Sequence, residues 1–215
     1  MTTVAVVTAL YGAYDPLKDQ PPQDMAADWI CVTDNPEVSA DPWRIVHEPR
    51  PHMHPRLAAK VPKCRPDLYT DADVIIWLDA SFLATEEWFV RWCVDQLGAA
   101  DIAQIRHPHR DNITLEASAS IRLDKYRGQM CRQQVDHYLA AGNVRPGLWC
   151  TGFAVRRNTP EVAAFGDRWL LEQVRWTYQD QLSQTACLGD LVTADLATSL
   201  TAGSPVRLFA HNRDD

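Results

Sequence analysis

The chain has 215 residues, with 21 basic and 28 acidic side chains and a formal net charge of −7. This length suits one domain over residues 1–215, and a hydrophobic content of 46% is typical of a packed globule, which excludes a disordered chain. The negative charge disfavours non-specific binding to nucleic acid, which requires a basic surface.

No segment is predicted to enter or cross a membrane. The longest apolar run, residues 74–78, is far shorter than the roughly 20 residues needed to span a bilayer. The N-terminus shows neither a basic region nor a small-residue cleavage site, so we expect no signal peptide. The cysteines occur singly, which favours small buried side chains in a reducing cytoplasm over disulfides or a zinc site. They are Cys31, Cys64, Cys93, Cys131, Cys150 and Cys187.

Apolar and β-branched segments predict the strands. Residues 3–10 are apolar without alternation, as expected for a strand buried on both faces, and residues 73–79 predict the strongest strand of the chain. Further strands are expected at residues 29–33, 102–105, 149–155 and 206–209.

Helices are predicted between these strands. Thr85 and Thr159 are expected to cap two of them, the first ending at Gly98 and the second carrying Pro160 at its first position. Others are expected at residues 56–63, about 116–141 and 180–188. Tryptophans at helical spacings are interpreted as core residues, namely Trp88, Trp92, Trp169 and Trp176. This alternation predicts an α/β sandwich built on a mostly parallel central sheet.

Ligands of open α/β sheets bind beyond the carboxyl ends of the strands. Asp79 follows the strongest predicted strand, so its carboxylate is expected at the rim of the sheet, where it could bridge a divalent cation to the phosphates of a ligand. The alternative is that Asp79 only begins a turn. His52 and His54 share strand spacing, but the proline-rich segment around them lacks carboxylates, so a metal site there is the weaker hypothesis.

Several short segments, taken in order along the chain, resemble one family. They run from Val7 to Asp15, Cys31 to Asn35, Pro42 to Ile45, Arg56 to Lys60 with Lys63, Ile76 to Asp79, His107 to Arg110 with Glu116, Thr151 to Arg157, and Asp180 to Ser183. The family is a glycosyltransferase-like domain with bacterial and plant members, first catalogued as a domain of unknown function. It is similar in outline to the glycogenin-type transferases of the GT-A (Rossmann-like) fold. The resemblance implies a GT-A-like enzyme that uses a nucleotide sugar.

The resemblance assigns the donor's nucleoside to the loop after the first strand, with Thr8, Leu10, Tyr11 and Tyr14, and to Asp34. For Thr8 the alternative is a buried strand end, and for Asp34 it is an Asx turn before a proline.

The donor's diphosphate would face Lys60 and Lys63, whose positive charge offsets that of the leaving group. Arg56 precedes Lys60 at i,i+4 spacing and could lie on the same helix face. The alternative is a solvated helix face, which is the commoner environment of lysine.

The resemblance also implies a divalent cation, Mn²⁺ or Mg²⁺, held by Asp79, Ser81 and His211. GT-A enzymes usually present an Asp-x-Asp pair here, and this chain replaces the second carboxylate by the neutral hydroxyl of Ser81. For His211 the alternative is an unstructured tail.

Two further groups are candidates for the chemistry. His107 and Arg110 could grip a phosphate or an acceptor hydroxyl, with Glu116 as a catalytic or orienting carboxylate, whereas the alternative is a polar surface loop. Asp180 and Gln181 resemble the Asp-Gln pair of glycogenin-type transferases. Asp180 would accept the acceptor's proton or stabilise positive charge on the anomeric carbon. Its alternative is an ordinary helix N-cap.

Three functions are therefore compared. The favoured one is a metal-assisted glycosyltransferase of hexosyltransferase type, acting on a glycan, lipid or other hydroxyl acceptor, with nucleic acid a less favoured acceptor. The second is an amidase-like hydrolase in which Asp79, His107 and His211 hold a metal that activates water. The third is an inactive module that binds a nucleotide or a glycan.

Overall fold

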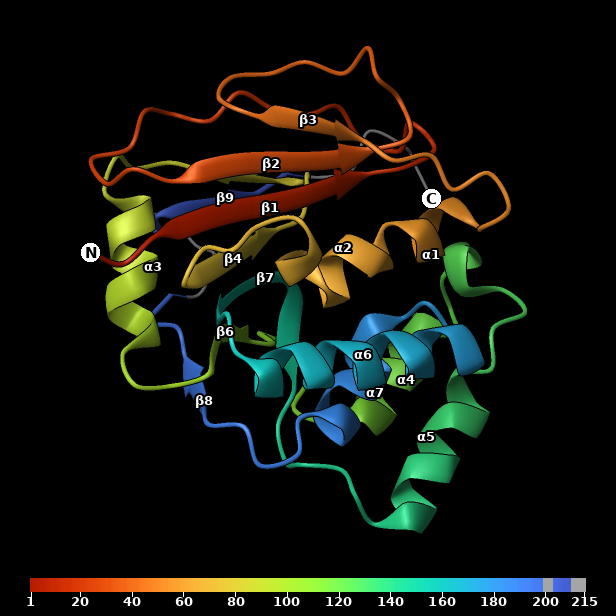
Figure 1. The fold of residues 1–215 in the computed structure, drawn as a ribbon. Helices are drawn as coiled ribbons and strands as arrows, with labels where there is room; N and C mark the ends of the chain where they lie inside the picture. Colours follow the sequence, from red (N-terminus) through yellow and green to blue (C-terminus); the bar gives the residue numbers. More distant parts are fainter. Residues whose placement is uncertain (199–202, 210–215) are drawn as a thin grey trace.

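The computed structural model describes residues 1–198 and 203–209. At its centre lies a seven-stranded sheet with the order β3-β2-β1-β4-β7-β6-β8 (Figure 1). β7 runs antiparallel to its neighbours β4 and β6, and the other adjacent pairs are parallel, so the predicted mostly parallel α/β fold is confirmed. The strands are β1 (Val4–Leu10), β2 (Asp28–Thr33), β3 (Arg44–His47), β4 (Val74–Leu78), β6 (Ile102–Arg106), β7 (Trp149–Arg157) and β8 (Thr193–Asp195).

The central strands are buried on both faces because alternate residues enter two different hydrophobic clusters. Val6 and Ile76 pack in one cluster, while Val7 and Trp77 pack in the other. This arrangement explains why β1 and β4 are apolar without alternation, as parallel strands covered on both sides are.

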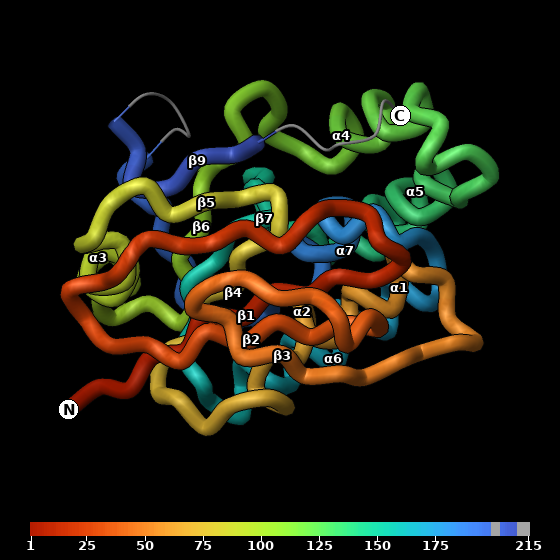
Figure 2. The backbone as a smooth tube through the Cα atoms, turned by 90° about the horizontal axis from the view of Figure 1, so that it is seen from above, coloured from red at the N-terminus to blue at the C-terminus, as the bar shows by residue number. Residues whose placement is uncertain are grey.

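Helices cover both faces of the sheet (Figure 1). α3 (Phe89–Leu97) packs on one face, and α1 (Pro55–Ala58), α2 (Lys60–Cys64), α6 (Pro160–Arg175) and α7 (Asp180–Cys187) lie on the other. α4 (Ile113–Ser120) and α5 (Cys131–Ala141) pack against α7, at the opposite end of the molecule from α3 (Figure 2). Two short 3-10 helices, η1 (Pro66–Leu68) and η2 (Asp124–Tyr126), complete the helical segments of the described residues.

A second, two-stranded sheet pairs β5 (Phe82–Ala84) with β9 (Val206–Leu208) in antiparallel register. The strand predicted near residue 206 therefore exists, although it lies outside the main sheet. β3, β5 and β8 were not predicted from the sequence, because strands of four, three and three residues carry too little pattern.

The helix predicted over residues 116–141 is wrong in its middle. α4 ends at Ser120 and α5 begins at Cys131, with η2 between them. Gly128 lies in this break at φ +79°, which glycine adopts readily and other residues avoid. The break matters because it brings Lys125 and Tyr126 to the functional cavity described below.

The predicted N-cap at Thr85 is also wrong. Its hydroxyl donates to the carbonyl of Ser204, and α3 begins only at Phe89, without a side-chain cap. Trp88 is 38% exposed and therefore not a core residue, whereas Trp169 is fully buried as predicted. Trp92 and Trp176 are half-buried.

The cap predicted for α6 is confirmed, since the Thr159 hydroxyl accepts the Val162 N–H and Pro160 follows at the first helical position. α6 is the longest of the described helices with 16 residues, and none of the helices in residues 1–198 and 203–209 combines the length and apolar character of a transmembrane span. All six cysteines are free thiols, and five of them are buried.

Candidate functional site

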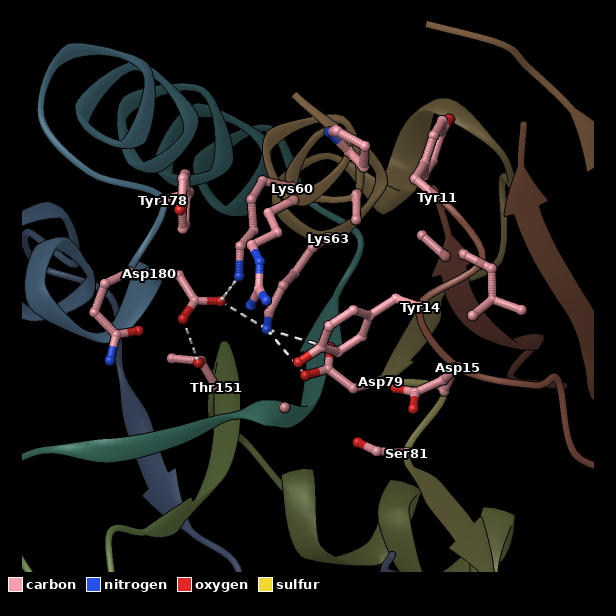
Figure 3. Close-up of a pocket in the computed structure, with 18 of the residues that line it drawn as sticks. Tyr11, Tyr14, Asp15, Lys60, Lys63, Asp79, Ser81, Thr151, Tyr178 and Asp180 are labelled. Carbon is pink, nitrogen blue, oxygen red and sulfur yellow. Dashed lines mark hydrogen bonds and ion pairs between the residues drawn. The ribbon is translucent and has the colours of Figure 1, made fainter. Parts of the chain in front are cut away.

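A cavity of about 540 Å³ opens beside the carboxyl ends of β1 and β4 (Figure 3). Its walls come from the loop after β1, from α1 and α2, from the turn after β4, from β7 and from the start of α7. This is the edge at which ligands of open α/β sheets bind. Of the candidate site residues singled out from the sequence, it is lined by Leu10, Tyr11, Tyr14, His54, Arg56, Lys60, Lys63, Asp79, Ser81, His107, Asp180 and Gln181.

Five other described residues that were singled out from the sequence do not line this cavity, and one of them is His52, from the weaker metal hypothesis. Thr8 is fully buried in β1, and its hydroxyl oxygen has no hydrogen-bond partner among the described residues, so its side chain is a buried strand end. Asp34 accepts the backbone N–H of Gly12 at 3.0 Å and thereby holds the loop after β1 in place. Arg110 and Glu116 lie behind the wall, as described below, and His211 falls outside the described residues.

Asp180 is the centre of a buried ion-pair network (Figure 3). One of its carboxylate oxygens, Oδ2, lies 2.6 Å from the Lys60 ammonium and 2.7 Å from the Lys63 ammonium. The other, Oδ1, accepts the Thr151 hydroxyl at 2.9 Å. The side chain of Lys63 is only 3% exposed and that of Lys60 is 16% exposed, so the alternative of a solvated lysine face is wrong.

Asp180 is not a helix N-cap either. It is the first residue of α7, and the cap position belongs to Gln179, whose side chain makes no capping bond. Gln181, the next residue, donates its side-chain amide to the carbonyl of Trp149 at 3.1 Å and so ties the start of α7 to β7.

Asp79 both begins a turn and faces the cavity. Its backbone carbonyl accepts the N–H of Phe82 at 2.8 Å, which closes a tight turn after β4. Its carboxylate accepts the indole N–H of Trp77 at 2.6 Å and lies 3.2 Å from the Lys63 ammonium. The two alternatives considered for Asp79 therefore describe different atoms of the same residue.

These contacts set the protonation of the cluster. Burial alone would raise the pKa of Asp180, but the two ammonium groups outweigh it and hold that pKa well below its usual value. Burial lowers the pKa of Lys60, which has a single close carboxylate and a neighbouring ammonium. Lys63 faces both Asp180 and Asp79, whose negative charges overcome its burial and raise its pKa. Asp180 and Lys63 are therefore charged at neutral pH.

Glu116 is buried behind the cavity wall. It forms an ion pair with Arg110 and accepts the side-chain amide of Gln179 at 2.8 Å and the Ser120 hydroxyl at 3.3 Å. His107 lies between this network and the cavity, with its Nε2 3.7 Å from the Glu116 carboxylate, and burial together with Arg110 lowers its pKa. The sequence grouped His107, Arg110 and Glu116 correctly, and only His107 reaches the cavity.

Aromatic rings line part of the cavity. His54 stacks on Tyr178 with ring centroids 5.1 Å apart, and Tyr126 lies 5.8 Å from Tyr178. The guanidinium of Arg56 lies over the ring of Tyr14 at 4.7 Å. Such rings present flat apolar faces beside polar edges, a surface suited to a ligand with both kinds of group.

Comparison with known families decides the classification. The model of the TOD1/MUCI70 glycosyltransferase-like domain matches residues 17–201. The chain belongs to this family. No curated protein matches the chain. The resemblance found in the sequence is thereby confirmed at the level of a glycosyltransferase-like family, while the glycogenin-type features stay predictions.

The TOD1/MUCI70 match contains the charged cluster, which we define as Lys60, Lys63, Asp79 and Asp180. It ends before His211 and begins after the loop that carries Tyr14. The family therefore supports a transferase in general, and the role of each side chain has to be argued from its contacts.

Two contacts fix the backbone that carries the lysines. The buried guanidinium of Arg156 donates to the carbonyl of Lys63 at 2.7 Å and lies over the ring of Trp169. Gly166 of α6 packs so closely on α2 that a Cβ atom there would lie 2.1 Å from the carbonyl oxygen of Cys64. α2 is therefore held rigidly at the end that carries Lys63.

The divalent cation predicted at Asp79, Ser81 and His211 stays a prediction. Asp79 and Ser81 line the cavity, but the described residues contain no group of three or more His, Cys, Asp or Glu that could hold a metal ion. Mg²⁺ and Mn²⁺ prefer several oxygen ligands, carboxylates above all. Asp79 already faces the ammonium of Lys63, and Ser81 adds only a neutral hydroxyl. These two side chains do not by themselves form a suitable ligand set for Mg²⁺ or Mn²⁺.

Several cavity residues were not singled out from the sequence. Thr151 lies in a segment that resembles the family, but hydroxyls on strands are too common to stand out. Tyr178 precedes Asp180 by two residues, and this proximity was the available signal. Lys125 and Tyr126 were hidden inside the helix predicted over residues 116–141.

Proposed function

We propose that this TOD1/MUCI70 domain transfers a sugar from a nucleotide-sugar donor to a hydroxyl of an acceptor. The observation that carries the proposal is the charged cluster, in which buried lysines and carboxylates meet inside a cavity at the carboxyl edge of the sheet. Transfer from a nucleotide sugar requires positive charge near the departing diphosphate and a carboxylate near the anomeric carbon.

In this proposal the nucleoside lies against the loop after β1, beside Tyr11 and Tyr14. Its diphosphate then meets Lys60 and Lys63, whose ammonium groups can be shared between the phosphate oxygens and Asp180. Fixed cations in a cavity shielded from water stabilise the leaving group without reorganising, which is the largest contribution in many transferases and hydrolases.

The low pKa of Asp180 favours one of its two candidate roles. A carboxylate with a depressed pKa is a weak proton acceptor at neutral pH, because general bases work best near the operating pH. The same carboxylate keeps its negative charge and can stabilise positive charge as it develops on the anomeric carbon. We therefore propose Asp180 as the residue that faces the reacting sugar, with Gln181 beside it.

The acceptor is proposed to enter along the aromatic side of the cavity. His54 and Tyr178 offer ring faces, and the neighbouring Gln179 to Gln181 segment offers polar groups for hydroxyls. A glycan or another polyhydroxylated molecule has this combination of flat apolar faces and hydroxyl edges.

A transfer assay tests the proposal. The protein is incubated with uridine, guanosine, adenosine and cytidine diphosphate sugars and a panel of glycan and lipid acceptors, and released nucleoside diphosphate and glycosylated product are both measured. We expect product that depends on an acceptor and is lost in Asp180→Asn. Release of donor sugar without transfer under every condition would favour a hydrolase, and neither reaction nor donor binding would reject the proposal.

A further inference from the structure

The ammonium of Lys63 lies between two carboxylates (Figure 3). It is 2.7 Å from Asp180 and 3.2 Å from the nearer oxygen of Asp79, and the other Asp79 oxygen is 3.4 Å away. At 3% exposure this side chain is almost completely buried, although it lines the cavity. The chain itself therefore provides a positive charge, that of Lys63, between the carboxylate of Asp79 at the strand end and the carboxylate of Asp180.

Lys63 has little freedom to leave this position. Its backbone carbonyl is held by Arg156, and its ammonium lies 5.8 Å from the centre of the Trp77 ring. Trp77 also donates to Asp79, so the strand, the turn and α2 fix one another. An ammonium has three N–H donors, and that of Lys63 contacts Asp180 and both carboxylate oxygens of Asp79. Because Lys63 also lines the cavity, an anionic ligand that enters the cavity can approach this ammonium.

A divalent cation at Asp79 would have to share this space. Two positive charges a few ångströms apart repel each other, and the burial of Lys63 weakens the screening of this repulsion by water. The sequence points the same way, because Ser81 provides a neutral hydroxyl where an Asp-x-Asp pair would provide a second carboxylate. The chain thus lacks the second carboxylate of that pair and has a fixed cation, Lys63, beside the first.

We propose that Lys63 takes the place of the divalent cation, so that the donor's diphosphate binds through Lys63 and Lys60 without a metal ion. This inference rests on the proposed function and specifies how its donor site works. It replaces the metal predicted at Asp79, Ser81 and His211 by a residue of the chain. The phosphate oxygens would share the ammonium of Lys63 with the carboxylates, and Asp79 would serve to position Lys63.

Calorimetry on the unmodified protein tests this inference. Uridine, guanosine, adenosine and cytidine diphosphates are titrated in MgCl₂, in MnCl₂ and in excess EDTA. We expect at least one of them to bind with an affinity that changes by no more than about two-fold between these conditions, since the cation is covalently attached. Affinity that falls about tenfold or more in EDTA would overturn the inference and leave the proposed transferase intact. Absence of binding in every condition would instead reject the donor site, and both proposals with it.

A pair of variants identifies the residue responsible. Lys63→Met keeps the length of the side chain and removes its charge, while Arg44→Met removes a cation from an exposed ion pair with Asp28, at the far edge of the sheet. In EDTA we expect Lys63→Met to bind the diphosphate at least about tenfold more weakly and Arg44→Met to bind as the parent does. A folded Lys63→Met protein, judged by circular dichroism, with parental affinity would overturn the inference. If that variant does not fold, the chelator experiment on the parent protein still decides.

Discussion

The side-chain amide of Gln179 donates to Glu116 at 2.8 Å, so a carboxylate buried outside the cavity holds the residue that immediately precedes Asp180. The same amide also contacts the Ser120 hydroxyl at 2.9 Å. α4 therefore positions the start of α7. Because Glu116 holds Gln179 and does not line the cavity, we propose that it positions Asp180 and does not touch substrate.

The first prediction follows from that placement. Glu116→Gln keeps the shape of the side chain but leaves the Arg110 guanidinium without its carboxylate, so we expect the free energy of unfolding to fall by about 1–3 kcal/mol. Donor affinity should stay unchanged, since Glu116 does not line the cavity, and turnover should fall less than in Asp180→Asn. Chemical denaturation, calorimetry and steady-state kinetics measure these three quantities. Turnover as low as that of Asp180→Asn, with unchanged stability, would return Glu116 to the catalytic residues.

The second prediction concerns Asp180→Asn. Its carboxylate is the partner of two buried ammonium groups, and removing one partner of a buried ion pair costs about 3–5 kcal/mol. We therefore expect both a lower melting temperature and a turnover reduced by orders of magnitude. Thr151→Val serves as a control, because it removes only the hydroxyl that donates to Asp180 and should cost about 1 kcal/mol. An Asp180→Asn protein with parental stability would mean that the ion pairs contribute little.

The third prediction is the pH dependence of stability. The folded-state pKa of Asp180 is depressed below its ordinary value of 3.8, so its contribution is fully present above that value and is lost as the pH falls towards the folded-state pKa. The free energy of unfolding of the parent should therefore drop below about pH 4 more steeply than that of Asp180→Asn. Urea denaturation of both proteins between pH 3 and 7 measures the difference. Parallel curves across this range would show that Asp180 titrates as in the unfolded chain.

The sequence predicts the elements that depend on neighbouring residues, but not those that depend on contacts between distant segments of the chain. The local sequence indicates four elements, namely β1, β4, α6 and α7. In the strands the signal is an apolar run typical of burial on two faces, and in the helices it is a cap or an amphipathic pattern. The two-stranded sheet was missed because β5 and β9 are short and pair across more than a hundred residues. The break between α4 and α5 was missed because most of the residues around Gly128 form helices readily, and a single glycine does not by itself end a helix.

For the cavity residues too, the sequence predicts local position but not the contacts between distant segments. Asp79 and Asp180 were singled out by their position after a strand and at a helix start, and both line the cavity. Their pairing through Lys63 joins three separate segments, so no local pattern contained it. Glu116 was grouped correctly with Arg110, but its depth behind the wall depends on how α4 packs against α7.

The last prediction tests whether the position of α2 controls the site. Gly166→Ala would place a Cβ atom 2.1 Å from the carbonyl oxygen of Cys64, one residue after Lys63, so α2 must move away from α6. Alanine normally stabilises a helix interior by about 1 kcal/mol relative to glycine, so a loss of stability here would come from the clash alone. We expect the free energy of unfolding to fall by about 1–3 kcal/mol, as for other overpacked cores. We also expect donor affinity to fall, because Lys60 and Lys63 shift relative to Asp180. Ala164→Ser adds one atom at an exposed position of the same helix, so it should lower stability only by about 0.5 kcal/mol, the difference in helix propensity, and leave donor affinity unchanged. Denaturation and calorimetry are carried out on both variants. If Gly166→Ala is less stable but keeps the parental donor affinity, the lysines keep their positions when α2 is displaced. If Gly166→Ala keeps the parental stability, α2 and α6 move apart without a cost in free energy.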